Sequence, residues 1–480
     1  MRWSAFFTAS LASAAAVQQQ QHHRRACSPA PPCTDVACVQ NATNFAFVYG
    51  APLYAAGTFV RAVPLAVTNF IYHQRNLATA AGVGVVRPNA DTVYSGIFVD
   101  VSAADLEVTL PEIKDRYWVF PFYDLYGNNI GNIGSINNDT AGKYIIKYKP
   151  DDYGVKYDNV PDGYVAQINL AAPYGLVIQR ILVTDDPDDI QKVRDIQDQI
   201  KTLVLPRLEL PVAPPWILSM FSDPRYLASA TNPLPLAILR LTAALAEWQQ
   251  PIVAGDRPWV ASLLKAAGIE HGVYTKPESA NLTIAVAAAN QSRQAYAAQP
   301  GAVKDMGHNW TIFNDVGNFL SHYVLRYIIA QVGYLILGPD QAIYPFYPNI
   351  DLPLGKAAIL TFSAKPKITP GGFWSLTAYD SEGFLVKNSL NRYAVGDHRG
   401  NLTFPDGTPL SDAAVDGPFK ILLQASNVNP PANWTSNWLP VSEAGGIAQV
   451  TLRWYGGEPI MNEVGGYDYP TLEIVDALQA

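Results

Sequence analysis

The stretch YWVFPFYDLYGNNIGNIGS, residues 117–135, indicates how the chain is organised. It begins with an apolar and aromatic run, which is typical of a β-strand buried on both faces. Polar side chains follow where the run ends: Asp124, Tyr126, Asn128, Asn129 and Asn132. A buried strand that ends in donors and acceptors beside aromatic rings often lines a pocket, so we expect a binding site here. The alternative is that these Asn and Gly residues only form turns, because both types favour left-handed backbone.

The spacing of this stretch returns in the C-terminal half of the chain. Tyr117-Trp118 is followed by Tyr123-Asp124. Phe373-Trp374 is followed by Tyr379-Asp380 at the same spacing. Repeated spacing is a sign of internal duplication. We therefore predict two related β-domains with the two Trp residues on corresponding strands, and helices from residues 206–300 outside both.

The composition is typical of a large globular protein. The chain has 480 residues, of which 49% are hydrophobic and 15% charged, so it can bury sizeable cores. A net charge of -8 and the lack of a Lys/Arg-rich run argue against a nucleic-acid partner. The 37 prolines and 34 glycines indicate many turns, as in β-rich architectures. We predict an α+β fold of two β-sandwich-like domains joined by a helical linker region.

The N-terminal residues have the features of an export signal. Arg2 precedes an apolar segment that ends in small residues, Ala14-Ala15-Ala16. This pattern predicts a secretory signal peptide in residues 1–17, and the segment is too short to serve as a membrane span. We therefore expect the protein to be secreted or to reside in the lumen of the secretory pathway. The oligomeric state stays open.

Cysteines and glycosylation sequons support the same location. All three cysteines, Cys27, Cys33 and Cys38, lie near the N-terminus, where an oxidising compartment would favour one disulfide and leave one thiol. Acceptor sequons for N-glycosylation occur at Asn41, Asn138, Asn281, Asn290, Asn309, Asn401 and Asn433.

The order of predicted elements divides the mature chain into parts. Residues 18–43 are expected to be a processed or flexible segment, and residues 44–205 an N-terminal β-rich domain with flanking helices. Residues 206–340 are expected to form a helical linker domain, and residues 341–480 a C-terminal β-sandwich-like domain.

Three local patterns carry further expectations. Pro64 should separate two helices within residues 44–74. Residues 319–337 should form a long buried helix, since its polar residues argue against a membrane span. Arg180 lies inside an apolar strand and needs a partner there.

Common catalytic motifs are missing from the sequence. There is no G-x-S-x-G, H-E-x-x-H, P-loop or G-x-G-x-x-G pattern. Hydride transfer, phosphoryl transfer and zinc-dependent hydrolysis therefore receive no support, and we expect neither a metal nor a cofactor. A catalytic triad dispersed along the chain stays open.

Several motifs resemble a known pair of domains. Arg87-Pro-Asn-x-Asp-Thr-x-Tyr94 and residues 117–134 resemble the domain of unknown function numbered twelve fifty-four. Four C-terminal motifs resemble the usual partner of that domain, the domain of unknown function numbered twelve fourteen. They are Phe373-Trp-Ser-Leu-Thr-x-Tyr-Asp380, Asn391-Arg-Tyr-x-x-Gly-Asp397, Asn437-Trp-Leu-Pro440 and Leu452-Arg-x-Tyr455. The resemblance covers nearly the whole mature chain. It implies two β-sandwich-like domains joined by helices, without a settled activity.

The signal peptide and the sequons are similar to those of secreted fungal members of this group. Some of these resemble hetero-Diels–Alderases of tropolonic sesquiterpene pathways, which join a quinone methide to a terpene alkene. That resemblance implies a cofactor-free cyclisation or cycloaddition of a small secondary metabolite. Holding two reactants in one geometry supplies on the order of 7–11 kcal/mol, and a hydrogen bond to the quinone-methide carbonyl makes it more electrophilic.

We expect this chemistry to use polar residues of the motifs. The expected catalytic residues are Arg87, Tyr94, Tyr123, Asn391 and Arg392. The expected substrate contacts are Asn89, Thr92, Tyr126, Asn128, Asn129, Trp374, Tyr379 and Tyr393. The alternative for the two arginines is a structural role, in which Arg87 and Arg392 pair with Asp91 and Asp397.

Two other functions stay open at this point. One is a hydrolase or lyase that uses Tyr or Asp for acid–base catalysis of a small molecule. The other is a carbohydrate- or cell-wall-binding protein, which would need exposed aromatic rings. We expect the aromatic residues of the motifs to line an interior cleft instead.

Overall fold

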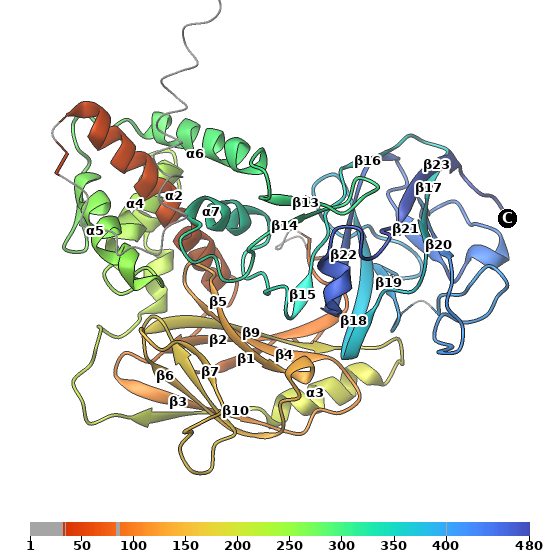
Figure 1. The fold of residues 1–480 in the computed structure, drawn as a ribbon, viewed down its shortest axis with the longest axis horizontal. Helices are drawn as coiled ribbons and strands as arrows, with labels where there is room; N and C mark the ends of the chain where they lie inside the picture. Colours follow the sequence, from red (N-terminus) through yellow and green to blue (C-terminus); the bar gives the residue numbers. More distant parts are fainter. Residues whose placement is uncertain (1–31, 34, 83–86, 400) are drawn as a thin grey trace, which may run out of the picture.

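The computed structural model describes residues 32–33, 35–82, 87–399 and 401–480. The predicted signal peptide and Cys27 lie outside these residues. The fold is α+β, as predicted: one β-sandwich comes from the N-terminal half, another from the C-terminal half, and a helical layer lies beside the first (Figure 1).

The N-terminal β-domain contains two five-stranded sheets. One sheet has the order β1-β2-β9-β4-β5, built from β1 (Ile71–His73), β2 (Thr92–Asp100), β4 (Trp118–Asp124), β5 (Asn129–Gly134) and β9 (Tyr174–Leu182). The other has the order β10-β3-β6-β8-β7, built from β3 (Ala104–Leu110), β6 (Gly142–Tyr148), β7 (Gly154–Lys156), β8 (Ala166–Leu170) and β10 (Lys201–Pro206).

Apolar side chains fill the space between these sheets. Trp118, Phe120 and Phe122 of β4 belong to this core, and Val193 of α3 (Asp189–Gln199) joins it. Alternate side chains of β4 point to opposite faces, and Val119 lies in a separate apolar cluster at the junction with the C-terminal domain. Every residue of β4 is buried, as its apolar run predicts.

Five helices form the helical layer: α2 (Val36–Arg61), α4 (Leu234–Leu245), α5 (Arg257–Ala266), α6 (Leu282–Ala297) and α7 (Tyr323–Val332). Helix α2 packs against the other four, so it is the centre of this layer (Figure 1). It begins inside the segment that was expected to be processed or flexible, with Asp35 as its N-cap. Cys33 and Cys38 form a disulfide across this helix start.

Two helix predictions were wrong. The segment after Pro64 contains strand β1 where a second helix was expected, because Ile71–His73 pairs with β2. The long helix predicted over residues 319–337 is limited to α7, which ends before Gly333; Leu335 then adopts a left-handed backbone with φ 63°. Within the described ranges, no helix is long and apolar enough to cross a membrane.

The C-terminal β-domain is a second sandwich. One sheet has the order β15-β22-β18-β19, with β16 also paired to β22, and consists of β15 (Ala342–Ile343), β16 (Ile350–Leu352), β18 (Ile368–Tyr379), β19 (Ala394–Gly396) and β22 (Gly446–Gly457). The other has the order β21-β20-β17-β23, from β17 (Lys356–Phe362), β20 (Phe419–Ala425), β21 (Trp438–Val441) and β23 (Thr471–Asp476). Trp374, Trp454 and Phe419 lie in the core between them.

Two short hairpins complete the strand inventory of the described residues. They are β11 (Ile269–Glu270) with β12 (Val273–Tyr274), and β13 (Val303–Asp305) with β14 (Thr311–Phe313). Both come from the region between the two sandwiches in sequence.

The predicted repeat corresponds to a repeat in strand register. In the N-terminal domain, Val119 of β4 pairs with Arg180 of β9. In the C-terminal domain, Ser375 of β18 pairs with Arg453 of β22. Each pair follows directly after the Trp of its motif, so β4 and β9 correspond to β18 and β22.

A glycine on the third strand completes each repeat. Gly134 of β5 pairs with the residue after Trp118, and Gly396 of β19 pairs with the residue after Trp374. A Cβ at either glycine would collide with the carbonyl oxygen of the preceding Trp in the neighbouring strand. Trp118 and Trp374 therefore occupy corresponding strands with the same close approach of the next backbone, as the duplication predicts.

Candidate functional site

The two repeats meet at the junction of the domains. Tyr117, which directly precedes β4, and Phe373 of β18 have ring centroids 5.2 Å apart. Tyr455 of β22 stacks on Phe373 at 4.4 Å and lies 5.0 Å from Tyr117. The aromatic residues that precede the two motif Trp residues thus form the apolar centre of the interface.

A pocket with a cavity volume of about 530 Å³ opens beside these rings. This volume lies in the range of small-molecule sites. Its apolar wall includes Tyr117, Trp118 and Phe373, and its polar groups are Asp115, Arg116, Ser135, Asn138, Asp139, Asp397 and His398. Arg116 already pairs with buried Asp189 at 2.8 Å, so the aspartates dominate the charge of the pocket.

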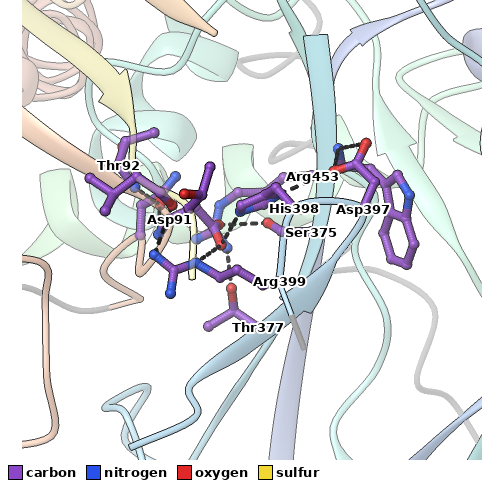
Figure 2. A network of polar contacts seen from close by, with 12 residues as sticks. Asp91, Thr92, Ser375, Thr377, Asp397, His398, Arg399 and Arg453 are labelled. Atoms are coloured by element: carbon purple, nitrogen blue, oxygen red, sulfur yellow. Dashed lines mark hydrogen bonds and ion pairs between the residues drawn. The ribbon is translucent and has the colours of Figure 1, made fainter. Parts of the chain in front are cut away.

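His398 joins the pocket to the N-terminal domain (Figure 2). Its Nε2 lies 3.3 Å from Asp91 Oδ1, and its Nδ1 lies 3.1 Å from Asp397 Oδ1. Burial lowers the pKa of His398, but hydrogen bonds and charges from Asp397 and Asp91 outweigh burial, so the pKa is raised above 6.5. The two carboxylates therefore favour the imidazolium form of the ring.

Asp91 is fully buried and contacts several groups of the C-terminal domain. Its Oδ2 accepts a hydrogen bond of 2.7 Å from Ser375 Oγ, and its Oδ1 lies 3.6 Å from Arg399 Nε. Burial alone would raise the pKa of Asp91, but the hydrogen bond and charge of His398, together with Arg399 and Arg453, lower it to about 2. Figure 2 shows these side chains converging on Asp91.

Two carboxylates of the pocket differ in their surroundings. Asp139 accepts hydrogen bonds of 2.8 Å from the Gly134 backbone N–H and from the Tyr157 hydroxyl. Burial nevertheless raises its pKa above 3.8. Asp397 contacts the His398 ring, accepts from the Trp374 backbone N–H at 3.3 Å, and keeps 40% of its side chain exposed.

A second polar cluster surrounds Arg180. Its Nη1 donates to the Tyr344 hydroxyl at 3.1 Å, and its Nη2 donates to the Leu335 carbonyl at 3.2 Å. The Tyr123 hydroxyl donates to the same carbonyl at 2.9 Å, and the guanidinium carbon lies 5.8 Å from the centre of the Tyr94 ring. Both terminal nitrogens of Arg180 therefore have hydrogen-bond partners, and the predicted residues Tyr94 and Tyr123 lie together beside the guanidinium.

Other predicted residues bridge the two domains. Arg87 donates to Gln449 Oε1 from Nε at 3.1 Å and from Nη2 at 2.7 Å, so the alternative pairing of Arg87 with Asp91 was wrong. Asn89 Nδ2 donates to the Tyr455 hydroxyl at 2.6 Å.

Tyr379 and Thr92 lie close to the same bridge. The Tyr379 hydroxyl donates to the Pro88 carbonyl at 2.9 Å and accepts from Arg453 Nη2 at 2.8 Å. Thr92 begins β2 and is buried.

Among the asparagines of residues 117–135, Asn128 stabilises the turn after β4, whereas Asn129 and Asn132 lie on β5. Asn128 Nδ2 donates to Asp124 Oδ2 at 2.6 Å, and its Oδ1 accepts from the Phe319 backbone N–H. Asn129 and Asn132 exchange hydrogen bonds of 3.0 and 2.8 Å. These contacts agree with the turn interpretation and do not place the side chains at the pocket.

Two aromatic residues expected at the substrate lie elsewhere. Tyr126 packs against the Arg326 guanidinium, 4.1 Å from its carbon, in the contact between β4 and the helical layer. Trp374 lies in the core of the C-terminal sandwich. Their aromatic character therefore reflects packing.

The motif Asn391-Arg-Tyr also contacts its own domain. Arg392 Nη1 donates to the carbonyls of Thr435 at 2.6 Å and Trp438 at 2.9 Å, so its alternative pairing with Asp397 was wrong. Asn391 adopts a left-handed backbone with φ 50° and is exposed, and Tyr393 packs against a small apolar cluster.

Sequence reasoning missed His398, Asp139 and Tyr117 as pocket residues. Asp397 ends one of the motifs, and His398 follows it directly, which is a signal that could have directed attention to the histidine. Asp139 is the middle residue of a sequon and has no motif of its own. Within the part of the chain that the structure describes, no group of three or more His, Cys, Asp or Glu residues could hold a metal ion.

Family models match two segments of the chain. Residues 68–203 match the protein of unknown function DUF1254, and residues 353–459 match the protein of unknown function DUF1214. The chain therefore belongs to the proteins that pair these two domains, as their motifs indicated. No curated protein matches it.

A solved structure at low sequence identity has the same fold. The VPA0106 protein from Vibrio parahaemolyticus has 18% sequence identity and a TM-score of 0.62, covering 91% of this chain and 100% of that chain. A putative uncharacterized protein from Burkholderia cenocepacia has 12% identity and a TM-score of 0.42, covering 97% of this chain and 94% of that chain. The first likeness shows the fold alone.

Proposed function

We propose that the protein is an enzyme that cleaves a bond to oxygen in a small hydroxylated molecule by acid–base catalysis. The observation that supports this is the presence of Asp139 and Asp397 in one interdomain pocket, in different electrostatic surroundings. Pairs of carboxyl groups whose environments differ often divide the roles of acid and base between them.

Asp139 is the proposed general acid. Burial raises its pKa, which keeps its proton available at higher pH than for a solvated aspartate. The Gly134 N–H and the Tyr157 hydroxyl hold the carboxyl group in one orientation. A positioned acid of this kind contributes roughly 10²–10⁴-fold to a rate.

Asp397 is the proposed base or nucleophile. The Trp374 N–H and the His398 ring orient its carboxylate, and its exposed part faces the pocket. Asp91, on the other side of His398, keeps the ring charged and in place. Asp91 and His398 are therefore positioning residues in this scheme.

The proposed substrate class follows from the lining of the pocket. Tyr117, Trp118 and Phe373 contribute apolar atoms to the pocket wall, which suits the apolar side of a sugar or polyol. Asp139 and Asp397 offer acceptors for hydroxyl groups, and the negative charge of the pocket disfavours anions. A glycoside-like molecule cleaved by hydrolysis or elimination satisfies both features.

Substitutions in the pocket test the proposal. The purified full chain is incubated with a panel of 4-nitrophenyl glycosides, and release of 4-nitrophenol is measured. Asp139→Asn and Asp397→Asn should each lower kcat by roughly 10²-fold or more. Asp115→Asn is the matched control, because it removes an equal charge from the same pocket at a left-handed position (φ 57°) that Asn tolerates. No turnover by the native protein, or equal losses in all three variants, would contradict the proposal.

A cofactor-free cycloaddition is the second candidate. It is favoured by the Arg180 cluster, where Tyr94, Tyr123 and Tyr344 supply hydroxyl groups beside a guanidinium that could polarise a carbonyl. Chelator-treated protein would be incubated with a quinone-methide precursor and a terpene alkene, and the enantiomeric excess measured. A racemic product formed at the uncatalysed rate would argue against this candidate.

We also propose that the protein is exported and glycosylated. All seven sequon asparagines are exposed, and the Cys33–Cys38 disulfide suits an oxidising compartment.

A further inference from the structure

Arg180 is a buried arginine with no carboxylate at ion-pair distance among the described residues. The residue is 7% exposed, and in the described part of the chain it makes no ion pair within 4 Å. Its two terminal nitrogens contact a phenol and a backbone carbonyl, while its buried Nε has no hydrogen-bond partner. Burial of a guanidinium without a counter-charge is costly, so a guanidinium placed in this way is suited to receive an anion.

The repeat provides an internal comparison for Arg180. Arg453 occupies the corresponding register position and donates to Thr377 Oγ1 at 2.7 Å and to the Tyr379 hydroxyl at 2.8 Å. Arg453 also feels the charge of Asp91, whereas the groups acting most strongly on Arg180 are all tyrosines. An aspartate is therefore among the groups that act most strongly on Arg453 but not among those that act most strongly on Arg180.

The surrounding tyrosines do not supply the missing negative charge. Burial raises the pKa of Tyr94, Tyr117 and Tyr123 above 10, despite the opposing charge of Arg180. These phenols therefore stay protonated and act as hydrogen-bond donors.

Two features of this cluster favour the binding of a ligand: an unpartnered hydroxyl group and two partly exposed tyrosines. The buried Tyr117 hydroxyl has no hydrogen-bond partner, although Arg180 acts on it electrostatically. Tyr94 and Tyr344 are only half-buried, in contrast to the fully buried Tyr123. Phenol rings, the unpartnered Tyr117 hydroxyl and a guanidinium together match an aromatic ring that carries an anionic group.

We propose that Arg180, Tyr94, Tyr117 and Tyr344 form a binding site for a small aromatic carboxylate. The guanidinium and the phenol hydroxyls bind the carboxylate oxygens, and the tyrosine rings pack against the ring of the ligand. This site does not depend on Asp139 or Asp397 and so stands apart from the acid–base proposal, although the Tyr117 ring is also part of the pocket wall.

Binding of benzoate to the full chain tests the site, with neutral benzamide as the isosteric control. Isothermal titration should show saturable binding of benzoate and at least tenfold weaker binding of benzamide. Arg180→Gln should weaken benzoate binding at least tenfold and reduce its preference over benzamide. Asp397→Asn should leave benzoate binding unchanged, which separates this site from the acid–base pocket.

Tyr117→Phe is the second variant, because it removes one hydroxyl and keeps the packing of the ring. It should weaken benzoate binding about threefold to tenfold, whether or not Arg180→Gln folds. Failure of the native protein to bind benzoate, equal binding of benzamide, or unchanged binding by Tyr117→Phe would each overturn the proposal.

Discussion

At the scale of single residues, Asp91 connects the two domains through charge. It directly precedes β2 of the N-terminal domain and contacts Ser375, His398 and Arg399 of the C-terminal domain. Because it is fully buried, loss of its charge would leave the His398 imidazolium and Arg399 without their shared partner. Asp91 is therefore the residue on which the electrostatics of the junction most directly depend.

The stability of the native protein should depend on pH in a direction set by these groups. Asp91 has a pKa of about 2 when folded and 3.8 as a free side chain. Its contribution, roughly 2 kcal/mol, is present above pH 3.8 and is lost as the pH falls toward 2. His398 has a raised pKa, so its contribution is present below pH 6.5 and is lost as the pH rises through the folded value. Urea unfolding between pH 2 and pH 9 measures both the loss of stability at low pH and the loss at high pH.

Asp91→Asn provides the comparison for that experiment. It should lower the free energy of unfolding by about 3–5 kcal/mol at neutral pH and flatten the loss below pH 4. Asp185→Asn is the control, because Asp185 is a half-exposed partner of the same Arg399 and its loss should cost about 0–1 kcal/mol. Equal losses in the free energy of unfolding in the two variants would show that the buried charge of Asp91 contributes no more than that of Asp185.

At the scale of elements, the same strand trio occurs twice. In each copy the residue after the motif Trp pairs with an arginine on one side and a glycine on the other. The glycine is required by space, because the neighbouring backbone leaves no room for a Cβ. The alternation of the central strand then places its Trp in the sandwich core and the preceding aromatic residue at the domain junction.

Alanine at either repeat glycine should therefore destabilise the protein. Gly134→Ala and Gly396→Ala should each cost about 1–3 kcal/mol, because the added methyl group displaces the backbone of the adjacent strand. Gly333→Ala is the control, since nothing lies within 4 Å of its Cβ position and its φ of -171° suits any residue. Thermal unfolding of the three variants measures the difference. A loss at only one of the two repeat glycines would contradict their equivalence.

At the scale of the whole molecule, the proposed export requires glycosylation sequons that lie on the surface. The seven sequon asparagines lie on α2, on α6 and its N-cap, on the 3-10 helix Ala432–Trp434 and on loops, and all are exposed. Their side chains are therefore accessible to a glycosyltransferase. Asn138 also lines the interdomain pocket, so a glycan there would stand at its rim.

Expression in a secreting eukaryotic host should therefore yield a glycoprotein in the medium. Treatment with an endoglycosidase should increase its electrophoretic mobility clearly, since several sequons carry glycans. Mass spectrometry of the treated protein identifies the occupied asparagines, with the same protein from a bacterial host as the unglycosylated control. Intracellular retention, or a mobility that the enzyme does not change, would contradict the proposal.

The sequence by itself determined the class of fold and the repeat. The apolar run of residues 117–123, the identical spacing around Trp374 and the apolar strand with Arg180 are local patterns, and each is a strand in the structure. Local patterns work here because burial on both faces demands continuous apolar residues. The boundaries of helices were less predictable: pairing with β2 turned Ile71–His73 into a strand.

The candidate site was decided only by the tertiary structure. Asp91, Asp139 and His398 are far apart in the chain, and their juxtaposition depends on how the two sandwiches pack. The motif asparagines and Arg392 looked like ligand contacts in sequence, yet they satisfy backbone and side-chain groups of nearby turns and loops. A polar residue beside an aromatic run has the same sequence signature in both roles, and only the partner that folding brings to it distinguishes them.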